Sequence, residues 1–130
     1  MAYTYADVEK LDKKPLVGSH QCVALVQQYA KAPQHELWKQ GTLVRTTKDI
    51  PKGTAIATFV NCKYPSKKTG NHAALFISQD NAGIKVMDQW KGDPNKPTVS
   101  MRTIRFKGAK KGGGLVEPLS NNGDAYYIIE

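Results

Sequence analysis

The chain has 130 residues, of which 40% are hydrophobic and 23% are charged. A chain of this length can bury about two thirds of its unfolded surface, so we expect one globular domain over residues 1–130 that needs no metal or cofactor to fold, and not a disordered chain, a collagen or a long coiled coil. The net charge of +8 favours a polyanionic partner, such as nucleic acid, an acidic membrane surface or a cell wall that carries carboxylates.

The first predicted element is a helix that begins at Ser19. Ser19 is a favourable N-cap, and Pro33 stops the segment. Between these two residues, one apolar face recurs at the helical spacing i, i+3, i+4 and i+7, formed by Cys22, Leu25, Val26 and Tyr29. The pattern predicts a helix as far as Ala30, with Cys22 in its first turn. A second, shorter helix is expected over residues 34–40.

Beyond Gly41 the hydrophobic period falls to two, which predicts strands. Five are expected, at residues 55–60, 72–77, 84–88, 99–106 and 125–129. The second of them is almost continuously apolar and should be central, and a turn at residues 81–83 joins it to the third as a hairpin. In the fourth, the alternation slips near Thr103, which predicts a bulge.

The order of these elements predicts an α+β fold, in which the helix that carries Cys22 packs on an antiparallel sheet of about five strands. Residues 94–97 and 107–114 are polar and rich in Gly, Pro and Lys, so we expect surface loops there. No internal repeat and no long linker divides the chain.

Cys22 is the first candidate for chemistry. Free N–H groups and the helix dipole at a helix start favour the thiolate, and a nearby histidine lowers the thiol pKa further. The structural alternative is a small core residue. His72 opens the central strand, where the helix start could reach it, although it could also be a hydrogen-bonded structural histidine. Asp88 closes the following strand and so should lie near His72, unless it is a solvated carboxylate.

Together these residues predict a triad for nucleophilic catalysis. Cys22 would attack, His72 would keep it ionised and then protonate the leaving amine, and Asp88 would orient the imidazole. The backbone N–H of Cys22 is the natural donor to an oxyanion, and Gln21 or His20 is expected to add another.

Aromatic and basic residues are candidates for a substrate cleft. Trp90 and Asn71 flank the triad in sequence and are expected to bind substrate, and Trp38 is either a cleft wall or a core aromatic. Six lysines lie in expected loops that either flank the cleft or only aid solubility: Lys63, Lys67, Lys68, Lys107, Lys110 and Lys111.

Three other interpretations compete with catalysis. The basic charge suggests a nucleic-acid-binding module, but the aromatic stacking platforms that single strands need are scarce. Two cysteines and three histidines lack the spacing of a zinc site, so we expect no metal. A disulfide between Cys22 and Cys62 would remove the nucleophile, so the catalytic interpretation needs Cys62 to stay apart, as a buried apolar residue.

The sequence lacks an apolar run of about 18 residues and a basic region followed by an apolar one at Met1–Asp7, so neither a transmembrane helix nor a secretory signal is expected. Two cysteines are too few for a disulfide framework. We therefore expect synthesis in the cytoplasm, without integral membrane association. Work in another compartment would require export by separate machinery.

Four motifs resemble the NlpC-type and CHAP-type papain-like cysteine peptidases and amidases of bacterial cell wall. The resemblance covers residues 18–90: the helix start Gly18–Val26, the turn and strand Pro51–Val60, the strand opening Gly70–Ile77, and the strand that ends at Asp88. Compact, basic and without a signal, the chain is most similar to small amidase effectors of the type VI secretion system. This similarity implies cleavage of peptidoglycan stems or cross-links in a target cell's periplasm, delivery by the secretion apparatus, and a cognate immunity protein.

Overall fold

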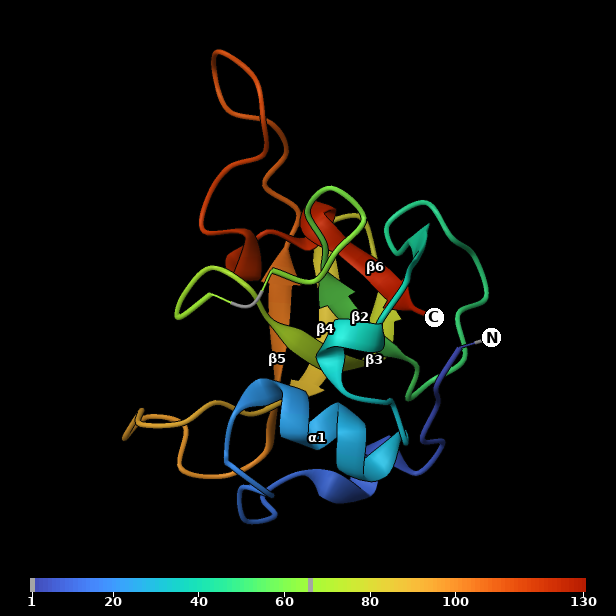
Figure 1. Ribbon diagram of the computed structural model, residues 1–130, viewed down its shortest axis with the longest axis vertical. Coiled ribbons are helices and arrows are strands. Elements are labelled where there is room, and N and C mark those ends of the chain that lie inside the picture. Colours follow the sequence, from blue (N-terminus) through green and yellow to red (C-terminus); the bar gives the residue numbers. More distant parts are fainter. Residues whose placement is uncertain (1, 66) are drawn as a thin grey trace.

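The computed structural model describes residues 2–65 and 67–130 and has one α-helix beside a six-stranded sheet (Figure 1). The helix is α1 (Cys22–Tyr29), and short 3-10 turns lie at Val8–Leu11, His35–Leu37, Leu119–Asn121 and Gly123–Ala125. The strands are β1 (Gln40–Leu43), β2 (Ala55–Thr58), β3 (Ala73–Gln79), β4 (Gly83–Asp88), β5 (Ser100–Arg105) and β6 (Tyr126–Ile129). The predicted α+β class is confirmed. Within the described ranges, none of the helices is long and apolar enough to cross a membrane.

The sheet has the order β1-β6-β2-β3-β4-β5, and each neighbouring pair is antiparallel. Strands β2 to β5 form the expected meander, and β6 returns along the free side of β2. The apolar run predicted a central strand, and β3 lies between β2 and β4 with its first five residues buried. The ends of β3 and β4 are therefore held on both sides by neighbouring strands.

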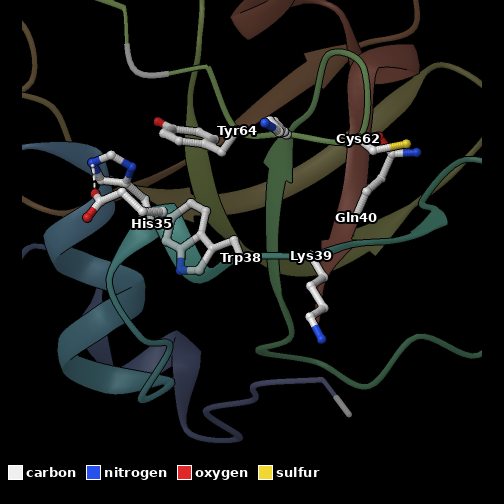
Figure 2. A pocket seen from close by; sticks show the side chains of 8 residues that line it. His35, Trp38, Lys39, Gln40, Cys62 and Tyr64 are labelled. Carbon is white, nitrogen blue, oxygen red and sulfur yellow. Dashed lines mark ion pairs between the residues drawn. The ribbon is translucent and has the colours of Figure 1, made fainter.

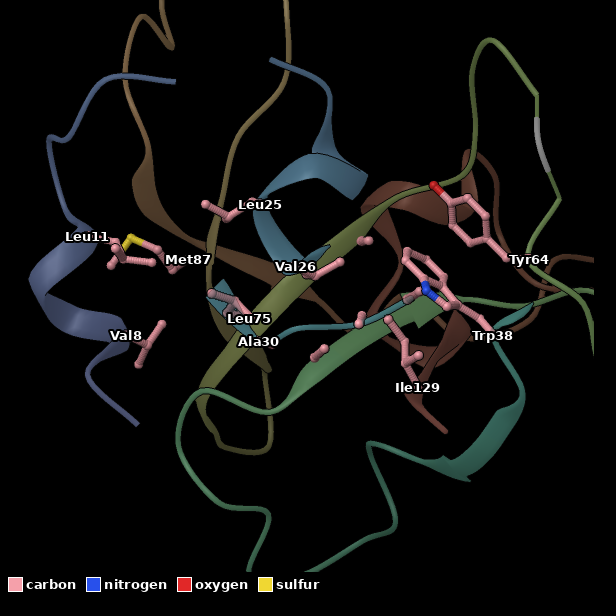
Figure 3. Packing of buried hydrophobic residues seen from close by; sticks show 14 of the residues in the cluster. Val8, Leu11, Leu25, Val26, Ala30, Trp38, Tyr64, Leu75, Met87 and Ile129 are labelled. Carbon is pink, nitrogen blue, oxygen red and sulfur yellow. The ribbon is translucent and has the colours of Figure 1, made fainter. Parts of the chain in front are cut away.

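Each face of the sheet carries its own apolar core. On one face, Leu25 and Val26 of α1 pack against Leu75 of β3, and Figure 3 shows Leu11 of the N-terminal turn beside Met87 of β4. The opposite face is built from the alternate strand residues, such as Phe76. Burying one such large side chain contributes about 1.5 to 3 kcal/mol, so this packing fixes α1 against the sheet.

The helix begins at Cys22 and not at Ser19, so the predicted N-cap is wrong. The residue before the helix is Gln21, whose backbone is extended, and the Ser19 hydroxyl accepts a hydrogen bond from the Gln21 N–H at 3.4 Å. Gly18 and His20 have φ angles of 55° and 70°, in the left-handed region, so the segment turns sharply before the helix starts. Cys22 thus becomes the first helical residue.

The second predicted helix, over residues 34–40, is also wrong. Only the single turn His35–Leu37 forms, and the chain then enters β1, a strand that the periodicity did not indicate. Lys39 and Glu130 exchange two backbone hydrogen bonds, of 2.6 and 2.8 Å, next to the pairing of β1 with β6. Pairing with the C-terminal strand therefore outweighs the local preference for a helix.

The bulge predicted near Thr103 is absent from the described pairing of β4 and β5, which runs in register from Gly83 opposite Arg105 to Asp88 opposite Ser100. The alternation slips in the sequence because a charged residue, Arg102, occupies the same side of β5 as the buried Ile104. The register does shift between β3 and β4, near Phe76 and Ser78.

Gly53 provides a test of the fold. Its φ angle is 91°, and a Cβ there would lie 1.8 Å from the carbonyl oxygen of Tyr5. Gly112 has a φ of 93° with open space around it, so Gly112→Ala adds backbone strain without a steric clash. We expect Gly53→Ala to lower the free energy of unfolding by about 1 to 3 kcal/mol more than Gly112→Ala. Urea unfolding followed by circular dichroism measures the difference, and equal losses would contradict this packing.

Candidate active site

The three predicted triad residues come together at one end of the sheet. Cys22 is the first residue of α1, His72 directly precedes β3, and Asp88 is the last residue of β4. The pairing of Leu75 with Met87 places Asp88 diagonally opposite His72, on the same face of the hairpin. His72 Nε2 lies 2.7 Å from Asp88 Oδ2, and the His72 ring is close enough to the Cys22 thiol to lower the pKa of that thiol. The structure therefore aligns sulfur, imidazole and carboxylate.

Burial and charge act against each other in this line of groups. Burial raises the pKa of the Cys22 thiol, but His72, together with hydrogen bonds from Tyr64 and the Ala73 backbone, lowers it more, so the pKa lies below its ordinary value. Burial also lowers the pKa of His72, but the hydrogen bonds and charges of Asp88 and Cys22 raise it above its ordinary value. Because Asp88 occupies Nε2, Nδ1 is the ring nitrogen left for the thiol. The arrangement favours a thiolate beside an imidazolium.

Asp88 is fully buried and held by two cations that the sequence did not indicate. Lys96 Nζ lies 2.9 Å from Oδ1, and Arg102 Nε lies 2.7 Å from Oδ2. Burial raises the pKa of Asp88, but His72, Arg102 and Lys96 outweigh burial and hold the pKa at about 2. Lys96 lies in the predicted surface loop at residues 94–97 yet is only 6% exposed, so that prediction is wrong for Lys96.

Trp90 covers this charged cluster. Its ring meets the His72 ring edge-on at 5.9 Å between centroids, and the cationic groups of Lys96 and Arg102 lie 4.7 and 5.0 Å from the indole centroid. The indole N–H donates to Asp93 at 3.0 Å, which fixes the ring orientation. Trp90 therefore shields the contacts of Asp88 from water and also forms part of the site.

Gln89 connects the acid strand to the start of the helix. Its buried side chain accepts a hydrogen bond from Val17 N–H at 2.9 Å, and its amide group donates to the carbonyls of Val17 and Gln21 at 3.1 and 2.8 Å. Gln89 follows Asp88 directly. Asp88 therefore contacts the imidazole, and the adjacent Gln89 fixes the segment that leads into Cys22. Sequence reasoning missed this residue.

Tyr64 and Asn71 complete the surroundings of the sulfur. Tyr64 Oη lies 3.6 Å from Cys22 Sγ, and Asn71 Nδ2 donates to Tyr64 Oη at 3.0 Å. Tyr64 lies in an irregular segment after β2 and was not predicted as a site residue. Asn71 was expected to bind substrate, and the structure places it one residue before His72, with its amide on Tyr64.

A cavity of about 730 Å³ opens onto the triad. Cys22 and His72 line it, and so do three of the predicted supporting residues, Gln21, Asn71 and Trp90. His20 is exposed and does not line this cavity. The six expected lysines divide into three groups. Lys67 and Lys68 line the cavity together with Lys91, and Lys63 lines a different cavity. Lys107, Lys110 and Lys111 belong to the long loop that projects beyond the end of the sheet (Figure 1).

A second cavity, of about 610 Å³, adjoins the first. His35 and Tyr64 line both cavities and form the wall between them. Figure 2 shows Trp38 below this wall and Gln40 on the far side. Trp38 is buried, packs 4.8 Å from the Tyr64 ring and donates its N–H to Pro33. Trp38 is thus a core aromatic that also borders a cavity.

Both cysteines are free thiols, and they differ in exposure. Cys62 is exposed in the turn after β2, with a φ angle of 66°, so its expected burial is wrong. Within residues 2–65 and 67–130, no group of three or more His, Cys, Asp and Glu side chains could hold a metal ion.

Comparison with known proteins decides the family. The family model for domesticated amidase effector 2 matches residues 4–129. The chain belongs to this family. A type VI secretion amidase effector 2 protein of Salmonella typhi is 48% identical over the whole of both chains. Domesticated amidase effector 2 of Ixodes scapularis is 37% identical, over 88% of this chain and 73% of that protein.

A solved structure of type 6 secretion amidase effector 2 (Tae2) has the same fold. It superposes with a TM-score of 0.89 at 47% identity, covering 98% of this chain and 94% of that one. The resemblance to amidase effectors inferred from the sequence is confirmed, and so is the fold predicted with it. Neither of these curated relatives has a name that points to nucleic-acid binding. Membership of this amidase effector family supports a peptidoglycan amidase activity.

The low pKa of Asp88 predicts a distinct acid response. The folded pKa is about 2 and the ordinary value is 3.8, so the ionised group stabilises the fold above pH 3.8, and this stability is lost as the pH falls through about 2. The shift corresponds to about 2 kcal/mol. The unfolding free energy of each protein decreases between pH 5 and pH 2. We expect this decrease to be about 2 kcal/mol smaller in Asp88→Asn than in the wild type.

Urea titrations at several pH values measure this slope. The exposed Asp7→Asn is the matched control, since among the described residues the Asp7 side chain makes a surface ion pair of 3.8 Å with Lys10. An Asp88→Asn protein with the acid slope of the wild type would show that Asp88 is not the group responsible.

Proposed function

We propose that this protein is a cysteine amidase that hydrolyses amide bonds in the peptide stems or cross-links of bacterial peptidoglycan, with Cys22 as nucleophile, His72 as acid and base, and Asp88 as the orienting group. The observation that carries the proposal is the alignment of the Cys22 thiol, the His72 ring and the Asp88 carboxylate at the edge of an open cavity. Family membership supplies the reaction class, because the relatives are named as amidase effectors.

The reaction begins with the thiolate of Cys22. Its sulfur attacks the scissile carbonyl carbon, so a C–S bond forms and the carbonyl electron pair moves onto oxygen. The backbone N–H of Cys22 lies at the positive end of α1 and donates a hydrogen bond to that oxygen. The His72 imidazolium then gives its proton to the leaving amine as the C–N bond breaks. Asp88 holds the ring by Nε2 throughout.

Water completes the cycle in a second half-reaction. The now neutral His72 takes a proton from a water molecule, which attacks the thioester carbon and releases the carboxylic acid product. Breaking the C–S bond regenerates the Cys22 thiolate beside the imidazolium. The two cations on Asp88 keep that carboxylate ionised at each stage, so it continues to accept the N–H of the ring.

Charge on the cavity rim supports a stem-peptide substrate. Lys67, Lys68 and Lys91 line the active-site cavity, and peptidoglycan stems carry free carboxylates that such lysines attract. Trp90 offers an apolar wall on the same side as His72, and Asn71 offers amide hydrogen bonds. We assign these residues to substrate binding and the whole chain to one catalytic domain.

The type VI secretion effector that matches over its whole length supports the rest of the proposal. The protein is made in the producing cell, is passed to the secretion apparatus, and acts in the periplasm of a target bacterium. A producing cell then needs a cognate immunity protein, and a protein that plugs the Cys22 cavity would meet this need.

Removal of the nucleophile tests the reaction. Cys22→Ala should reduce peptide release from purified sacculi by several orders of magnitude, because no other group forms the covalent intermediate. The exposed Cys62→Ala is the matched control and should keep full activity and a similar thermal midpoint. Mass spectrometry of the products identifies the bond cut. Full activity in Cys22→Ala would contradict the proposal.

The acid limb of the pH profile tests the role of His72. In a Cys62→Ala background, the rate of iodoacetamide alkylation reports the thiolate of Cys22 alone. His72 lowers the pKa of this thiol, so His72→Ala should move the alkylation midpoint up by at least about one pH unit. The activity of the parent protein should decrease at pH values below its own alkylation midpoint, where Cys22 gains a proton. It should decrease again at high pH, above the raised pKa of His72, where the imidazolium loses its proton. An unchanged alkylation midpoint would show that His72 does not lower the pKa of the Cys22 thiol.

A further inference from the structure

Tyr64 places a hydroxyl beside the nucleophile from an unexpected part of the chain. Its Oη lies 3.6 Å from Cys22 Sγ, and the residue is 8% exposed. The ring is held from below by Trp38 at 4.8 Å and by His35 at 5.6 Å. Figure 2 shows the hydroxyl pointing away from Cys62 and Gln40, out of the second cavity. The phenol is therefore fixed in direction and faces the catalytic sulfur.

Asn71 determines what the hydroxyl can do. Its amide nitrogen, Nδ2, donates to Tyr64 Oη at 3.0 Å, and an amide N–H cannot accept. The phenol oxygen thus uses a lone pair on Asn71, which leaves its one proton for the side where Cys22 lies. A hydroxyl in this position donates toward the reacting atoms.

We propose that Tyr64 is a further catalytic residue, whose hydroxyl donates a hydrogen bond to the oxyanion of the tetrahedral intermediate beside the backbone N–H of Cys22. The oxyanion is bonded to the carbon that is bonded to Sγ, so it lies two bonds from the sulfur and within reach of a donor 3.6 Å from that sulfur. Of the two residues expected from the sequence to give the second donor, His20 is exposed and does not line the cavity, and Gln21 lines it from an exposed position. This inference rests on the proposed function.

The proton of Tyr64 stays on its oxygen during the reaction. As the Cys22 sulfur bonds to carbon, negative charge leaves the sulfur and appears on the carbonyl oxygen, and the hydrogen bond of the phenol moves with it from sulfur to oxygen. When the C–N bond breaks, the leaving amine takes its proton from His72, and the oxyanion returns its electron pair to the carbonyl. Burial, followed by the charge of Cys22, holds the pKa of Tyr64 well above its ordinary value, so the phenol donates without ionising.

The variant Tyr64→Phe removes this one oxygen atom. We expect kcat for peptide release from sacculi to fall by about 100-fold or more, as with other oxyanion donors, with little change in KM. Tyr29→Phe is the matched control, since Tyr29 lies at the other end of α1 and packs on Tyr5. Its kcat should equal that of the wild type. A Tyr64→Phe protein with wild-type kcat would overturn the inference.

A second measurement separates the oxyanion from the thiolate. Tyr64 also stabilises the thiolate of Cys22, so part of the loss could come from a smaller thiolate fraction. Iodoacetamide alkylation in the Cys62→Ala background measures that fraction at the assay pH. The oxyanion role predicts a loss of kcat at least about tenfold larger than the loss of thiolate, since the donor also acts after the attack. Equal losses would overturn it.

Asn71→Ala keeps the test decisive if Tyr64→Phe does not fold. This variant leaves the tyrosine ring in place and removes the amide that directs the hydroxyl, so kcat should fall by about tenfold. An unchanged kcat would count against the inference. The two proposals fail separately: an active Cys22→Ala protein overturns the amidase mechanism, whereas a fully active Tyr64→Phe beside an inactive Cys22→Ala overturns only the role of Tyr64.

Discussion

The geometry and charge of the rest of the site depend on the buried carboxylate of Asp88. A lone buried carboxylate would take up a proton, but Asp88 has Lys96, Arg102 and His72 around it, and together they keep it ionised. Its negative charge then stabilises the imidazolium, and the imidazolium stabilises the thiolate. Trp90 closes the group on one side. The reactivity of a sulfur at the surface of the cavity therefore depends on an ion cluster in the interior.

The β3–β4 hairpin and the helix share one scaffold. Backbone register places the imidazole and the carboxylate on one face, and no loop intervenes between Asp88 and the sheet. The side-chain amide of Gln89, the first residue after β4, hydrogen-bonds to the segment before α1. The positions of the Asp88 carboxylate and of the segment that leads into Cys22 are thus linked through two adjacent residues, Asp88 and Gln89. A shift in the register of β4 would displace both, which makes the geometry a property of the sheet.

The sequence allowed prediction of those site residues that stand at the ends of regular elements. A thiol at a helix start, a histidine before an apolar strand and an acid at a strand end are visible from periodicity alone. Arg102 shares a side of its strand with Ile104, and this spacing is a usable signal, although the sequence alone predicts a bulge there. Lys96 and Tyr64 lie in irregular segments, where no period relates residue number to direction, so their approach to the site depends on tertiary packing. The strand β1 was hidden for the same reason.

The two cysteines illustrate how a fold makes like groups unlike. In the unfolded chain they are chemically similar thiols with no neighbours of consequence. Folding leaves Cys62 in an exposed turn and places Cys22 against an imidazole and a phenol that come from distant parts of the chain. A reagent that distinguishes the two sulfurs therefore reports whether tertiary structure is present. The reactivity of the Cys22 thiol therefore depends on the folded state of the protein.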